Sequence, residues 1–146
     1  MENLLYQQVK ALTEHEHDLI ANLSNISACL NQHLGKINWV GFYIVKEGEL
    51  VLGPFQGKPA CIRIPFGKGV CGTCVEERKI QRVADVHKFK GHIACDSASN
   101  SEIVLPIIKN DEVVTVLDID SPIFDRFSEE DEKLLSEVAD YITHLF

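Results

Sequence analysis

Apolar and polar residues alternate with helical spacing along the first 34 positions. Apolar side chains recur every three or four residues over 2–34, which is the period of an amphipathic helix. This series consists of Leu5, Val9, Leu12, Leu19, Leu23, Ile26, Leu30 and Leu34. Gly35 follows, and glycine commonly ends a helix. The pattern predicts an N-terminal helical segment over 1–35.

The pattern changes to that of strands in the centre of the chain. Residues 37–45 are β-branched and aromatic, and Glu47-Gly48 supplies a turn into a second strand at 49–53. The remaining expected elements are strands at 60–64, 80–83, 101–108 and 112–119, a short helix at 70–78, and a polar loop at 85–100. The last two strands are separated by three polar residues, which favours a hairpin.

The C-terminal pattern is helical again. Ser128 followed by Asp131 is typical of a capping box, and an apolar stripe follows it, so a helix is predicted over 128–146. The order of elements predicts an α+β fold in one domain, 1–146, with the sheet and pocket loops at 37–120. We expect a central antiparallel sheet, with the N- and C-terminal helices packed on one face and the long loops on the other.

Composition narrows the classes of function. The 146 residues carry a net charge of −8, which argues against a nucleic-acid partner because such partners require a basic face. No signal peptide is recognisable, and no run of about 18 apolar residues predicts a membrane span. Five cysteines without an export signal indicate a reducing compartment, so we expect a cytoplasmic location.

Four of the cysteines lie in the loop-rich middle of the chain. Cys71 and Cys74 form a C-x-x-C motif, which is typical either of a redox pair or of half a zinc site completed by Cys95 and by His92 or His87. Cys95 lies in a polar loop, where reactive residues concentrate, although Asp96 opposes its thiolate unless a donor compensates. Cys29 lies beside the helical stripe and is expected to be an inert buried thiol.

Three acidic residues interrupt strands that are otherwise apolar: Glu102, Asp118 and Asp120. Period-2 alternation puts Asp118 and Asp120 on one face of their strand. Two carboxylates on one face repel unless they share a cation, a proton or a donor. They are either an exposed strand end or a site for a cationic group, with one acid kept protonated as a proton donor.

Six blocks in matching order give the chain a family resemblance. They are NWVGFY (38–43), LGPFQGKPAC (52–61), FGKGVCGT (66–73), GHIACD (91–96), SEIVLP (101–106) and LDID (117–120). Together they resemble the free methionine-(R)-sulfoxide reductases, from about residue 38 to the C-terminus. Position 74 departs from the family pattern, where alanine is more familiar than Cys74, and this adds a thiol beside the site.

The resemblance implies a GAF domain whose pocket carries catalysis by thiol chemistry. Cys95 matches the cysteine that attacks the sulfoxide, Cys61 matches its disulfide partner, and Cys71 matches a third cysteine that is a second resolving thiol or an alternative nucleophile. The three acids match the cluster that holds the substrate and assists the sulfoxide oxygen. Trp39 and Tyr43 match the aromatic wall around the substrate methyl group.

The resemblance also implies partners. The reaction would need no metal or other cofactor, and a thioredoxin-like reductant would restore the thiols. The terminal helices are compatible with a homodimer. Two other hypotheses remain at this point: a non-catalytic GAF sensor for a small molecule, and a zinc-binding module that uses Cys71, Cys74, His92 and Cys95.

Overall fold

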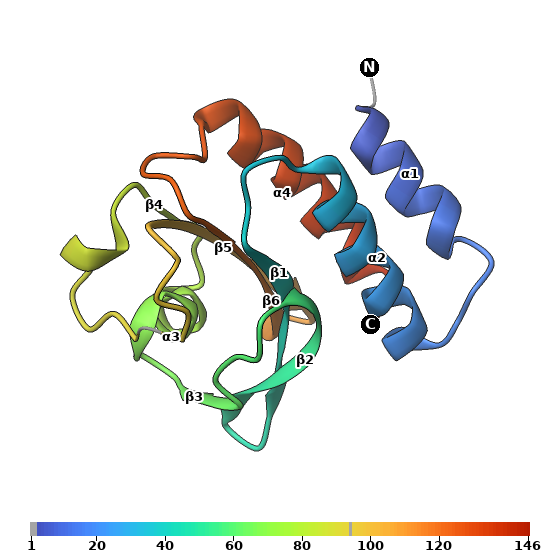
Figure 1. Cartoon of the computed structure of the whole chain (residues 1–146). Helices are drawn as coiled ribbons and strands as arrows, with labels where there is room; N and C mark the ends of the chain where they lie inside the picture. The colour runs from blue at the N-terminus through green and yellow to red at the C-terminus, as the bar shows by residue number, and fades with distance from the viewer. Residues whose placement is uncertain (1–2, 94) are drawn as a thin grey trace.

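A six-stranded antiparallel sheet separates two layers in the computed structural model, which describes residues 3–93 and 95–146 (Figure 1). The strand order is β3-β2-β1-β6-β5-β4. The strands are β1 Trp39–Lys46, β2 Glu49–Gly57, β3 Arg63–Pro65, β4 Gln81–Val83, β5 Ser101–Lys109 and β6 Glu112–Ser121. The helices are α1 Leu4–Thr13, α2 Leu19–His33, α3 Gly69–Glu77 and α4 Glu129–Thr143, with a 3-10 turn η1 at Val86–Lys88.

The expected layering is confirmed. Helices α1, α2 and α4 lie on one side of the sheet, and α3 with the long loops lies on the other (Figure 1). Ser128 caps α4 and forms the predicted capping box with Asp131. Within the described residues, no helix combines the length and the apolar character needed to cross a bilayer.

The N-terminal segment is two helices, so the prediction of one continuous helix over 2–34 was wrong. The chain leaves the helix after Thr13, and Asp18 caps the next helix by accepting from the amide of Ala21 at 2.8 Å. In between, the Glu16 carboxylate accepts from the amides of His17 and Asp18. These local bonds satisfy a turn that the apolar spacing does not show. Residues 1 and 2 of the predicted segment lie outside the described residues.

The strand predictions are confirmed in position and differ in length. Strand β2 runs to Gly57, four residues beyond the predicted end, because it continues to pair with β1 past Pro54. Strand β3 covers only 63–65 and not 60–64, since Cys61 is engaged in a disulfide outside the sheet. The predicted hairpin between the last two strands is present as the antiparallel pair β5–β6.

Alternation along the strands divides the core between the two faces. The helix-side face of the three central strands presents Val40, Phe42, Ile103, Leu105, Leu117 and Ile119, all of them buried. Helices α2 and α4 cover them with Leu23, Ile26, Leu30, Leu135, Val138 and Ile142. Each such side chain contributes roughly 1.5–3 kcal/mol when it leaves water, so this face holds the sheet in place. The opposite face carries a second apolar cluster, which includes Val104 and Val116, and the acidic residues lie beside it.

Helix α3 approaches strand β3 closely at a glycine. A Cβ added to Gly72 would lie 2.5 Å from the carbonyl oxygen of Pro65, and the Gly72 carbonyl itself accepts from the amide of Gly67 at 2.9 Å. Only a residue without a side chain allows this approach. It sets the position of Cys71, which precedes Gly72 in the same helix.

We predict that Gly72→Ala destabilises the protein. Helix propensity alone would favour alanine by about 1 kcal/mol. The backbone contact with Pro65 must yield, however, and overpacking of this kind costs about 1–3 kcal/mol, so the net change should be unfavourable. The measurement is the free energy of unfolding in urea. Gly35→Ala is the matched control, because nothing lies within 4 Å of its Cβ position. Equal stability of the two variants would contradict the packing argument.

Candidate active site

A pocket lies on the face of the sheet opposite α1, α2 and α4. Its walls come from the sheet, from α3 and from the loop between η1 and β5. The residues predicted for the site that line it are Trp39, Tyr43, Cys71, Cys95, Glu102, Asp118 and Asp120. Cys61 reaches the same place through its bond to Cys95. The structure therefore brings all eight predicted residues together.

Strand register assembles the acidic cluster. Glu102 on β5 is directly opposite Asp120 on β6, and Trp39 on β1 flanks Asp120 from the other side. Asp118 lies two residues before Asp120 and so shares its face. The exposed fractions of Glu102 and Asp118 are only 7% and 5%. The alternative of an exposed strand end is therefore wrong.

Burial dominates the electrostatics of this cluster. It raises the pKa of Glu102 well above its usual value, and the charges of Asp118 and Asp120 raise it further. Burial and the charge of Asp118 likewise raise the pKa of Asp120. The pKa of Asp118 is also raised by burial, but hydrogen bonds from Glu102 and Cys71 partly offset the effect. The cluster therefore retains protons where exposed acids have lost them, and Asp118 is its best-stabilised carboxylate.

One acceptor in the cluster is left open. Oδ1 of Asp118 is buried and has no hydrogen-bond partner among the described residues. A buried carboxylate oxygen without a donor is costly, so the site favours a ligand that supplies an N–H or O–H group.

Cys71 faces this cluster from α3. Its thiol hydrogen-bonds to Asp118, and burial together with the three neighbouring acids raises the pKa of the thiol well above its usual value. Sγ of Cys71 and carboxylate oxygens of Glu102 and Asp118 lie within 4.8 Å of one another. At neutral pH Cys71 is therefore a neutral donor to the carboxylates and a poor nucleophile.

The positions of the four proposed zinc ligands argue against a zinc-binding module. Cys95 is joined to Cys61, and Sγ of Cys74 points to the carbonyl oxygen of Val104 at 3.7 Å. Among residues 3–93 and 95–146, Cys71, Cys74, His92 and Cys95 do not meet as a ligand group. Burial raises the pKa of the Cys74 thiol, so this residue behaves as a small core side chain.

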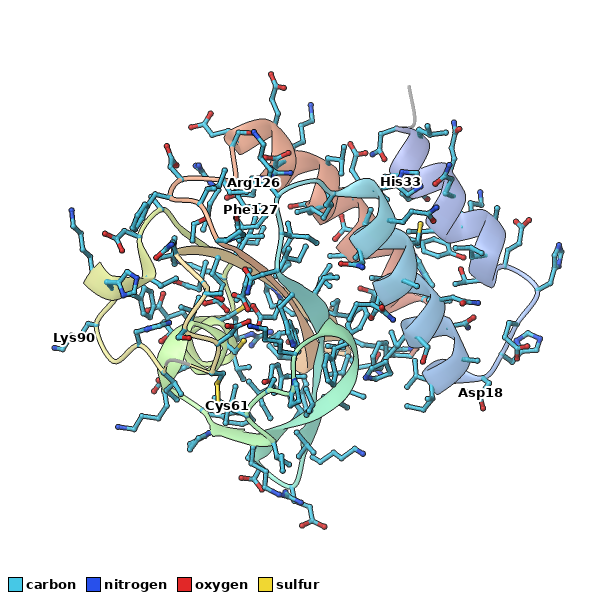
Figure 2. The ribbon with its side chains drawn as sticks, in the orientation of Figure 1. Asp18, His33, Cys61, Lys90, Arg126 and Phe127 are labelled. Carbon is cyan, nitrogen blue, oxygen red and sulfur yellow. A yellow bond between two sulfur atoms is a disulfide. The ribbon has the colours of Figure 1, made fainter. Side chains whose placement is uncertain are left out.

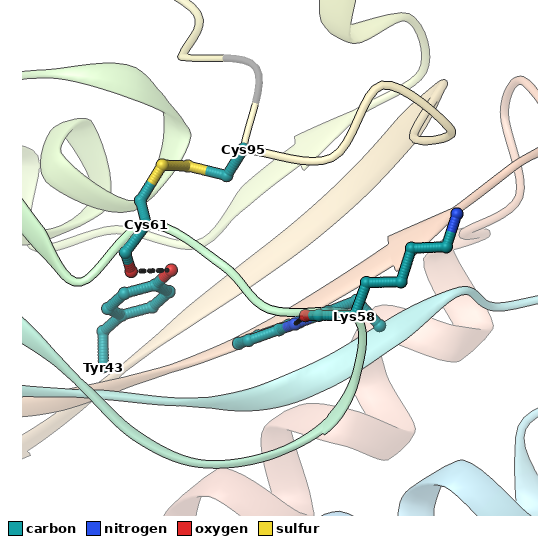
Figure 3. The surroundings of a disulfide bond; sticks show 5 residues. Tyr43, Lys58, Cys61 and Cys95 are labelled. Carbon is teal, nitrogen blue, oxygen red and sulfur yellow. Dashed lines mark hydrogen bonds between the residues drawn. A yellow bond between two sulfur atoms is a disulfide. The ribbon is translucent and has the colours of Figure 1, made fainter.

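The Cys61–Cys95 disulfide joins two loops beside Tyr43 (Figure 3), and Cys95 places it at the pocket. The two Cα atoms are 5.5 Å apart, and the bond joins segments 34 residues apart in sequence. Cys95 contacts the pocket, whereas Cys61 lies behind it and is not part of the lining. The hydroxyl of Tyr43 donates to the carbonyl of Cys61 at 2.9 Å, which ties the disulfide to the aromatic wall.

Stacked rings form the apolar wall. Trp39 lies between Tyr43 and Phe55, with ring centroids 5.8 and 5.1 Å away. Its indole N–H donates to the carbonyl of Lys58 at 3.1 Å. Since both polar ends, the Trp39 N–H and the Tyr43 hydroxyl, are fixed, the ring faces form a rigid apolar surface beside the acids.

The role of Asn38 was not predicted from the sequence. Its Nδ2 donates to the Asp96 carboxylate at 2.9 Å and to the Ser99 hydroxyl at 3.1 Å, so it fastens the loop of Cys95 to the start of β1. The amide of Ala98 also donates to Asp96. These donors compensate the charge that was expected to oppose a thiolate at Cys95. The one available signal was a polar residue at the start of an apolar strand. Ala94, in the same loop, lies outside the described residues.

We predict that Glu102→Gln changes the pH dependence of stability. Below about pH 4.5, the usual value for glutamate, folded and unfolded chains both carry the Glu102 proton. As the pH rises, the unfolded chain loses it while the folded chain keeps it, so the wild-type fold loses stability until its own raised pKa is passed. Glutamine removes this loss.

The measurement is urea unfolding from pH 4.5 to pH 8.5. The stability of Glu102→Gln relative to wild type should increase with pH across this range. Glu130→Gln, on the exposed side of α4, is the control and should leave the pH dependence as it is. A constant difference between Glu102→Gln and wild type would show that Glu102 is not held protonated.

Comparison with known proteins agrees with this geometry. A GAF domain family model matches residues 17–146. The chain is 58% identical to protein YtsP of Bacillus subtilis, over 94% of this chain and 85% of the relative. It is 54% identical to the free methionine-R-sulfoxide reductase of Escherichia coli, over 92% and 82%. The structure of fRMsr of Staphylococcus aureus in complex with substrate is 58% identical and superposes with a TM-score of 0.93, over 97% and 93%. The chain therefore belongs to the GAF-domain family of free methionine-(R)-sulfoxide reductases.

Proposed function

We propose that this protein reduces free methionine-(R)-sulfoxide to methionine, with Cys95 as the attacking thiol and Cys61 as the resolving thiol. The observation that carries the proposal is the disulfide between these two residues at the wall of a pocket with three acids. Such a bond is the oxidised product expected after one turnover. The Neisseria meningitidis reductase, 42% identical to this chain with a TM-score of 0.94, is likewise known in complex with its substrate.

The chemistry follows from the placement of thiols and acids. The Cys95 thiolate attacks the sulfoxide sulfur while the carboxyl cluster protonates the oxygen. The hydroxyl then passes to the Cys95 sulfur as the S–O bond and the new S–S bond break, which gives methionine and a Cys95 sulfenic acid. The Cys61 thiol then attacks the Cys95 sulfur, water leaves, and the disulfide forms. In sum, one sulfoxide and two thiols give one thioether, one disulfide and one water. Glu102 is suited to donate the proton because its raised pKa keeps it protonated.

The same pocket accounts for selection of the free amino acid. The open Oδ1 of Asp118 is an acceptor for the substrate ammonium group, and Asp120 at the rim adds negative charge. The faces of Trp39 and Tyr43 bound the space for the S-methyl group. A methionine within a polypeptide has no ammonium group to offer, so its binding would leave the buried carboxylate unpaired.

Cys95 is assigned the attack in preference to Cys71 for an electrostatic reason. Burial and three carboxyl groups disfavour the Cys71 thiolate, whereas the acid next to Cys95 is compensated by Asn38 and the Ala98 amide. Cys71 is therefore placed as a neutral thiol beside Asp118 and takes no part in resolving the sulfenic acid.

We also propose a reductant, a cellular location and an oligomeric state for the protein. A thioredoxin-like dithiol protein reduces the disulfide and restores both thiols. The free cysteines at positions 29, 71 and 74 fit the reducing cytoplasm. Exposed apolar side chains on α1 and α2, including Leu12 and Ile20, support a homodimer through the terminal helices.

We predict distinct failures for the two cysteines. Cys95→Ser should lower turnover of methionine-(R)-sulfoxide at least about 10³-fold, because no sulfenic acid forms. Cys61→Ser should release about one methionine per chain and then stall, because the sulfenic acid has no resolving partner. The assay follows NADPH consumption with thioredoxin and its reductase, together with methionine released in the first turnover.

Cys29→Ala is the control, since Cys29 lies in the helical layer far from the pocket, and the S epimer controls for substrate. Normal steady-state turnover by Cys95→Ser would refute the assignment of the nucleophile. No turnover of either epimer by folded, reduced wild-type protein would favour the ligand-binding sensor.

A further inference from the structure

The two segments that carry the disulfide cysteines are basic in an otherwise acidic chain. Segments 57–69 and 86–95, which carry Cys61 and Cys95, contain five of the 14 lysines and arginines and none of the 22 acids. The rest of the chain therefore has a formal charge of −13. The five residues are Lys58, Arg63, Lys68, Lys88 and Lys90, and all are exposed. Within the described part of the chain, Arg63 pairs with Glu49, while the four lysines form no ion pair.

Exposed apolar side chains lie in the same two segments. Ile62 directly follows Cys61 and is 67% exposed, and Phe66 is 40% exposed in the turn after β3. Ile93, 37% exposed, precedes Cys95 by two residues. A hydrogen bond from the amide of Gly69 to the carbonyl of Gly91, 3.0 Å long, holds the two segments together. Large apolar side chains beside a redox-active bond indicate a protein contact and not a solvated loop.

The two cysteines of the disulfide differ in their contact with the substrate pocket. Cys95 lines the substrate pocket and Cys61 does not, so Cys61 is the sulfur that lies away from the substrate. Figure 2 shows Cys61 and Lys90 on the half of the molecule away from α1, and in Figure 3 the side chain of Lys58 extends from the segment that leads to Cys61. Cys61 is half-buried and lies outside the pocket lining, so it is the cysteine that a reductant would approach from outside the pocket.

We propose that Ile62, Phe66, Lys88 and Lys90 form a docking surface, the recycling surface, for a dithiol protein of net negative charge. The proposal rests on the proposed function, because it assigns the partner of that reaction to a face of the molecule. The rest of the chain has a formal charge of −13 and would repel an acidic partner, whereas these lysines would attract it, so the partner is oriented toward Cys61 as it approaches. The apolar side chains then supply contact area around the attacked bond.

Thiol–disulfide exchange at this surface reduces the Cys61–Cys95 bond in two steps. One thiolate of the partner attacks Sγ of Cys61, the Cys61–Cys95 bond breaks, and Cys95 leaves as a thiolate that takes up a proton. The second thiol of the partner then attacks the mixed disulfide and releases Cys61. Two electrons pass to the protein, and the partner ends as a disulfide.

Two double variants test the recycling surface in the full-length protein. Ile62→Ser with Phe66→Ser removes the apolar contact, and Lys88→Glu with Lys90→Glu reverses the charge. Turnover of methionine-(R)-sulfoxide is measured with an acidic thioredoxin, its reductase and NADPH, and separately with the small uncharged dithiol dithiothreitol.

We expect each variant to raise KM for thioredoxin at least about fivefold. With dithiothreitol, turnover should stay within about twofold of wild type, because the pocket is untouched. The charge variant should also lose the salt sensitivity of KM.

Matched controls carry the same changes elsewhere. Ile123→Ser alters an exposed apolar residue in the turn after β6, and Lys10→Glu with Lys133→Glu makes the same charge change on α1 and α4. Neither should change KM for thioredoxin. Unchanged KM in the surface variants, or equal losses with both reductants, would overturn the docking proposal and leave the reductase intact. Failure of wild type to turn over with dithiothreitol would instead refute the proposed function.

Discussion

The site depends on the cost of burying three carboxyl groups side by side. Glu102 and Asp118 are buried and Asp120 is half-buried on the same sheet face, so the three cannot all be ionised unless a cation joins them. The cluster therefore holds protons, and it leaves one oxygen of Asp118 unpartnered. A substrate that brings an ammonium group and an oxygen to be protonated relieves both constraints. We regard this electrostatic demand as the reason that the pocket selects a free amino acid.

The rest of the fold maintains that arrangement. The helical layer buries one face of the sheet and so fixes the register that sets Glu102 opposite Asp120. On the other face, the close approach of α3 at Gly72 brings the Cys71 thiol to Asp118. Asn38 binds Asp96 and so holds the loop of Cys95 beside the acidic cluster. Rigid elements thus position the acids, while Cys95, the proposed attacking thiol, lies on a loop, where a disulfide can form and break.

The sequence predicts local features well and pairing poorly. Period-2 alternation placed Asp118 and Asp120 on one face, and the capping residues located α4, because both signals are local. That Glu102 meets them depends on strand register, which no local pattern contains. The disulfide partner of Cys95 came only from family resemblance, since five cysteines allow many pairings. The break after Thr13 was missed because the apolar spacing continues across it, from Leu12 to Leu19. The function of the buried acids thus became clear only when the strands were paired.

The central claim is that the buried carboxylates select the substrate by its ammonium group. The most direct test compares kcat/KM for free methionine-(R)-sulfoxide with that for its N-acetyl derivative, which keeps the sulfoxide but has no ammonium. The account predicts that acetylation lowers kcat/KM at least about 10²-fold, since Asp118 is left buried without a partner. Equal kcat/KM for the two compounds would contradict it.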